Sequence, residues 1–71
     1  MIPNSIAKDI AKIAPQADPQ LVYGYLLLAE FRFSEISRRA LNREIRIAAE
    51  CVSADPEQAA RVAASYGLGA A

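Results

Sequence analysis

The sequence contains no histidine and no tryptophan, and Cys51 is its single cysteine. One thiol cannot form a disulfide within the chain, and alone it cannot complete a structural zinc site. The absence of histidine also removes the usual base that activates a serine or cysteine nucleophile. The three glycines, at positions 24, 67 and 69, match no phosphate-binding loop. We therefore expect a protein that is not an enzyme and that uses no cofactor or metal.

The chain has no excess of positive or negative charge, because its eight basic residues balance its eight acidic residues. A neutral chain has no overall field that attracts nucleic acid or an acidic membrane. The longest apolar run, residues 25–29, is far shorter than the roughly 20 residues of a membrane span. The first residues lack the basic region and long apolar segment of a signal peptide. These features predict a soluble, cytoplasmic protein that does not enter a membrane.

Capping residues and prolines predict two short helices, one toward each end of the chain. The first covers about residues 4–14, with Asn4 or Ser5 as the N-cap, and it stops before Pro15. The last covers about residues 56–66. It begins after Asp55, which with Gln58 outlines a capping box, and ends at Gly67 in a Schellman motif.

The central segment, about residues 19–52, starts with the strong signal Asp18-Pro19 and then contains no further proline. Two apolar stripes follow it at helical spacing. The first stripe is Val22, Leu26, Ala29, Phe33, Ile36, Ala40, Ile47 and Cys51, and the second is Tyr23, Leu27, Phe31, Leu41, Ile45, Ala48 and Val52. The segment is predicted as one helix of roughly 50 Å, or as two helices broken near residue 33, where Ser34 could cap a new helix, or near residue 42.

The predicted fold is therefore all-α, a single helical domain over residues 1–71 with three helices, or four if the central helix is broken. Two short helices cannot cover both apolar faces of so long a rod, which leaves one face for a second copy or another protein. The predicted interface consists of Tyr23, Gly24, Leu27 and Phe31. The expected function is a helical oligomerisation or protein-interaction module, most simply a homodimer. Cys51 is expected to be a small core residue.

Five of the six arginines lie between residues 32 and 46. On a helix, four of them share one side, namely Arg32, Arg39, Arg43 and Arg46. Such a row can contact phosphates, so the alternative function is a small DNA-binding transcriptional regulator with a degenerate helix-turn-helix in this segment.

A solvated helix flank is the simpler interpretation of the same arginines. Glu35 can pair with Arg39, and Glu50 with Arg46, each at four-residue spacing. The helix-turn-helix pattern is also imperfect, since Leu41 replaces the glycine that is usual in the turn. We therefore rank nucleic-acid binding below protein interaction.

Overall fold

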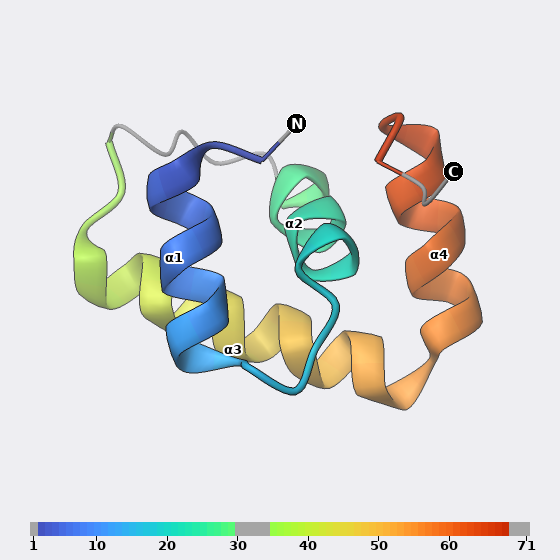
Figure 1. Cartoon of the computed structure of the whole chain (residues 1–71), viewed down its shortest axis with the longest axis horizontal. Coiled ribbons are helices and arrows are strands. Elements are labelled where there is room, and N and C mark those ends of the chain that lie inside the picture. Colours follow the sequence, from blue (N-terminus) through green and yellow to red (C-terminus); the bar gives the residue numbers. More distant parts are fainter. Residues whose placement is uncertain (1, 30–34, 69–71) are drawn as a thin grey trace.

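The computed structural model describes residues 2–29 and 35–68 of the chain. This part is all-helical and contains four α-helices. They are α1 (Asn4–Ile13), α2 (Pro19–Leu28), α3 (Arg38–Ala54) and α4 (Pro56–Ser65). In Figure 1, α3 runs along the long axis of the molecule, and α2 lies between α1 and α4. None of these helices has the length and apolar content needed to cross a bilayer.

Both predicted Asp-Pro helix starts are confirmed. The side chain of Asp18 accepts a hydrogen bond from the Gln20 N–H at 2.9 Å, and the next residue is the first of α2. The side chain of Asp55 accepts from the Gln58 N–H at 3.1 Å at the start of α4. Each carboxylate satisfies a backbone donor that has no partner within its own helix. These two boundaries are therefore set by local sequence.

The predicted N-cap of the first helix is wrong. Asn4 is already helical, and the residue before it, Pro3, contributes no side-chain cap. The Pro3 carbonyl instead accepts from the Ala7 N–H at 2.9 Å, which is the first helical hydrogen bond. Pro3 itself is extended, with a φ of −57° and a ψ of 141°, so it precedes the helix and is not its first helical residue.

The predicted continuous central helix is also wrong, because α2 ends at Leu28 and α3 begins at Arg38. The interruption falls between Leu28 and Arg38, an interval that includes residue 33, one of the two positions considered, whereas residue 42 lies inside α3. The new helix is capped by Ser37, whose Oγ accepts from the Ala40 N–H at 3.1 Å. Ser34, the expected cap, lies outside the described residues. The chain consequently folds back into a body of 29 × 20 × 19 Å.

The end of α4 is the predicted Schellman motif. The Leu68 N–H donates to the Ala63 carbonyl at 2.9 Å, and the Gly67 N–H donates to the Ala64 carbonyl at 3.0 Å. Gly67 has a φ of 72°, a left-handed conformation that glycine adopts without a Cβ clash. Leu68 is buried, so the turn returns an apolar side chain to the core.

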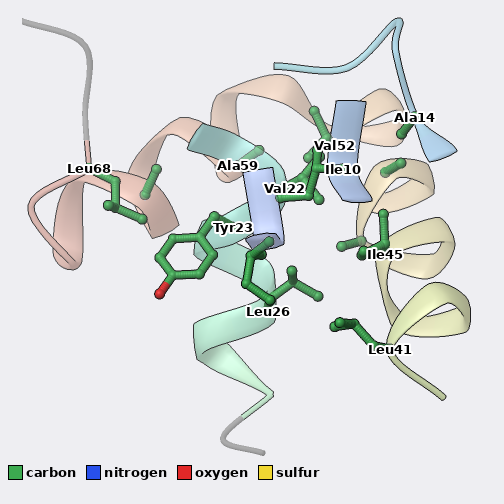
Figure 2. Packing of buried hydrophobic residues seen from close by; sticks show 14 residues of the cluster. Ile10, Ala14, Val22, Tyr23, Leu26, Leu41, Ile45, Val52, Ala59 and Leu68 are labelled. Atoms are coloured by element: carbon green, nitrogen blue, oxygen red, sulfur yellow. The ribbon is translucent and has the colours of Figure 1, made fainter. Parts of the chain in front are cut away.

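The core lies where α2 meets the other three helices (Figure 2). α2 packs most extensively against α4 and then against α3, while α1 contacts both α2 and α3. The largest fully buried side chains are those of Ile10, Val22, Leu26 and Ile45. Among the described residues, no polar or charged residue is buried in this core. Packing of apolar side chains is therefore the main source of stability.

The two helices bury the apolar stripes differently. In α2, the buried residues include Val22 and Leu26 of the first stripe and Tyr23 of the second. In α3, all the buried members belong to the second stripe, apart from Ala49, and Ile47 and Cys51 of the first stripe are exposed. The prediction that Cys51 is a core residue is therefore wrong. The two helices are oriented separately about their own axes. Residues that would share one side of a continuous helix therefore do not all face the core.

Candidate functional site

An apolar groove runs between α2 and α3, with a volume of about 280 Å³. Its lining consists of Tyr25, Leu26, Leu28, Ala29, Glu44, Ile47, Ala48 and Cys51. Leu26 and Ala48 are buried core residues and form its floor, whereas Leu28 is 51% exposed and Ile47 is 46% exposed. Exposed apolar side chains above an apolar floor are typical of a surface that contacts another molecule.

The sequences of the two helices explain why this groove is apolar. α2 contains no charged residue, so its outward side also carries apolar side chains, of which Leu28 is the most exposed. On α3, Arg43, Ile47 and Cys51 follow each other at four-residue spacing and form one ridge on the helix surface. The apolar half of this ridge borders the groove, and Arg43 lies one turn before it.

The described residues of the predicted interface do not line this groove. Tyr23 is only 8% exposed, and Gly24 is buried. Leu27 is partly buried and packs against the core cluster, and Phe31 lies outside the described residues. The close approach that Gly24 permits is to α4 of the same chain, since a Cβ there would lie 3.1 Å from the Ala63 Cα.

The observed fold removes the reason for which the sequence predicted a dimer. That reasoning assumed a rod with one uncovered apolar face, but in the compact body the chain's own helices bury most described members of the second stripe and, from the first stripe, Val22 and Leu26. Self-association stays a prediction, and the surface that now bears on it is the groove beside Leu28 and Ile47. Sequence reasoning missed this groove. The one available signal was that the segment of α2 is apolar on every side, so that some of it had to remain exposed.

The arginine row is partly present. Arg39, Arg43 and Arg46 are exposed on α3, while Arg32 lies outside the described residues. Arg38 is used within the chain, since its Nη1 donates to Asp9 Oδ1 of α1 at 2.9 Å. This pair ties the start of α3 to α1, although so exposed an arginine contributes little stability.

One of the two ion pairs predicted for these arginines does not form in the described part of the chain. Arg46 and Glu50, both inside the described range, form no ion pair. The turn required by the helix-turn-helix interpretation is absent, because Leu41 and Asn42 lie within α3. DNA binding itself stays a prediction.

A second, more polar hollow lies between α1 and α3. Two cavities of about 530 and 390 Å³ both have Ile13 and Arg46 in their walls. The smaller one is also lined by Lys12 and by Asn42, whose Oδ1 is buried without a hydrogen-bond donor. Over the described part of the chain, no group of three potential metal ligands comes together. This hollow is wider and more charged than the α2–α3 groove and exposes no large apolar side chain.

Comparison with protein-family models, with curated proteins and with solved structures returned no match.

Proposed function

We propose that this domain is a non-enzymatic protein-interaction module that self-associates through the groove between α2 and α3. One observation carries the proposal. Leu28 and Ile47 are the most exposed large apolar side chains among the described residues, and both line the same groove. Covering apolar surface is favourable by about 25 cal/mol per Å², which drives association where such surface is contiguous.

The lining of the groove supports a protein partner over a small-molecule ligand. Small-molecule sites combine an apolar pocket with a few converging polar groups that fix the orientation of the ligand. This groove also carries polar groups, on Glu44, Tyr25 and Cys51, but its apolar Leu28 and Ile47 side chains are about half exposed and do not enclose a pocket. An open groove with side chains of this kind is suited to receiving apolar side chains from another protein surface.

Sedimentation equilibrium from low to high micromolar concentration tests the proposal. We expect the native chain to associate, and Ile47→Lys or Leu28→Lys to remain monomeric with unchanged helical content. Tyr66→Lys is the matched control, because Tyr66 is 41% exposed but does not line the groove. This variant should associate as the native chain does. A native chain that stays monomeric, or groove variants that associate normally, would refute the proposal.

The thiol of Cys51 provides an independent measurement without any mutation. It is exposed and lines the groove. If the groove is covered on association, the rate of Cys51 modification by a neutral thiol reagent falls as protein concentration rises. The Ile47→Lys variant should show no such dependence. A constant rate for the native chain across its association range would place the contact elsewhere.

Nucleic-acid binding is the second candidate, and the exposure of Arg39, Arg43 and Arg46 on one helix favours it. Arginine side chains bind phosphate groups well. Glu44 and Glu50 lie on the same helix, however, and reduce the positive potential of this surface. We therefore rank nucleic-acid binding below self-association.

A further inference from the structure

The smaller of the two cavities between α1 and α3 is a basic and polar hollow of about 390 Å³. Three residues of α3 line it, namely Arg38, Asn42 and Arg46, and their four-residue spacing places them in one row along the helix. Lys12 lines the same cavity from α1. Positive side chains from two helices therefore converge on one space, at a different pair of helices from the α2–α3 groove.

The cavity has more positive than negative groups in its walls. Lys12, Arg38 and Arg46 are positive, and Asp9 is the one described carboxylate in the lining. Asp9 Oδ1 already accepts a hydrogen bond from Arg38 Nη1 at 2.9 Å. Across the described part of the chain, neither Lys12 nor Arg46 forms an ion pair. Two positive charges in the cavity therefore have no counter-charge.

The neighbouring charges do not cancel this excess. Glu50 lies one turn after Arg46 but lines only the adjoining cavity of about 530 Å³, and Glu44 lines the α2–α3 groove instead. The C-terminal end of α1 carries about half a negative charge, which the N-terminal end of α3 at Arg38 offsets with about half a positive charge. Further basic residues are exposed on the same two helices, namely Lys8, Arg39 and Arg43.

Independently of self-association, we propose that this cavity binds the phosphate group of a small molecule. A phosphate group carries nearly two negative charges at neutral pH, which matches the two unpaired positive charges. Lys12 and Arg46 supply charge-assisted hydrogen bonds, and the planar guanidinium of Arg46 fits two phosphate oxygens at once. Asn42 adds a neutral donor, because its Oδ1 is buried and its amide nitrogen is the polar atom that a ligand can reach.

The size of the cavity favours a small ligand over a large polyanion. Its volume of about 390 Å³ lies within the range of about 300–1,000 Å³ that is typical of small-molecule sites. Ile13 lines both this cavity and the adjoining one, so an apolar wall is present beside the basic groups. A compact phosphate monoester can therefore place its phosphate against Lys12 and Arg46 and its remaining atoms against Ile13.

Titration of the full chain with inorganic phosphate, followed by proton–nitrogen NMR at neutral pH, tests this site. Chloride keeps the ionic strength constant, so that general screening does not contribute. We expect shifts that saturate at millimolar phosphate and are largest for the backbone amides around Lys12 and Asn42. Lys12→Gln and Arg46→Gln should each bind phosphate about tenfold more weakly, the change that loss of one charge-assisted hydrogen bond produces.

Arg61→Gln is the matched control for the loss of one positive charge. Arg61 is exposed on α4, where it donates to Gln58 Oε1, and it does not line the cavity. This variant should bind phosphate as the native chain does, and glycerol phosphate should shift the same amides as free phosphate. Shifts that rise without saturation, or an equal loss of affinity in Arg61→Gln and Arg46→Gln, overturn the site. A DNA duplex that shifts these amides when free phosphate does not also overturns it.

Discussion

Gly24 is the residue at which a single added methyl group tests the packing of this fold most directly. A Cβ at this position would lie 3.1 Å from the Ala63 Cα, 3.3 Å from the Ala63 nitrogen and 3.4 Å from the Ala63 Cβ. The two nearest atoms belong to the backbone of α4, which cannot rotate away as a side chain can. The helix must therefore shift by a few tenths of an ångström to accept Gly24→Ala.

Two opposing effects set the magnitude for Gly24→Ala. Alanine is preferred to glycine inside a helix by about 1 kcal/mol. Overpacking of a well-filled core costs about 1–3 kcal/mol. Because α2 packs most extensively against α4, we expect overpacking to dominate. Gly24→Ala should then lower the free energy of unfolding by about 1 kcal/mol, which lowers Tm by about 4–8 °C in a domain of this size.

Urea unfolding followed by circular dichroism measures this change, at one protein concentration for all variants because association shifts apparent stability. Ala60→Gly on the exposed side of α4 is the control for helix preference, and it should cost about 1 kcal/mol. If helix preference alone acted, Gly24→Ala would stabilise by as much as Ala60→Gly destabilises. That result would refute the close approach of α2 to α4.

Three further outcomes are expected. Asp18→Ala and Asp55→Ala should each lower the free energy of unfolding by about 0.5–2 kcal/mol, because each removes an N-cap. Unchanged urea midpoints for both variants would contradict the observed caps. Gly67→Ala should lower the free energy of unfolding by about 1 kcal/mol, because a φ of 72° disfavours a residue with a Cβ. Ala64→Gly, at an exposed site inside α4, should lower it by about the same amount through the poor helix preference of glycine, and should leave the Schellman turn intact. Fluorescence anisotropy at physiological salt should show no sequence-dependent duplex binding. If such binding does occur, Arg39→Glu with Arg43→Glu should abolish it and the affinity should fall steeply with salt.

The helix ends near Asp18, Asp55 and Gly67 could be predicted because each depends on residues within one turn. The aspartate of an Asp-Pro pair supplies a side-chain acceptor for a backbone N–H, and the proline supplies a fixed φ. A glycine after a helix permits the left-handed residue that closes it. The structure uses all three residues in these roles. Local chemistry was sufficient at these three helix ends but not at the start of α1, which follows Pro3 without a side-chain cap.

The interruption of the central helix could not be decided in the same way. Ser37 caps α3 in the structure, but Ser34 is an equally good cap by residue type, and the apolar spacing continues across both positions. The choice depends on how much surface the chain buries by folding α2 back onto α3 and α4. That gain comes from residues distant in sequence, such as Gly24 and Ala63.

The sequence by itself determined an all-helical chain, its three local capping signals and its lack of histidine-based chemistry. Only the tertiary structure decided which apolar side chains remain exposed. Ile47 belongs to a stripe that a continuous helix would have buried together with Leu26, yet the two residues now form a wall and the floor of one groove. The reason is that exposure depends on the rotation of each helix about its own axis. Packing against the other helices sets that rotation, and no local pattern within one helix can specify it.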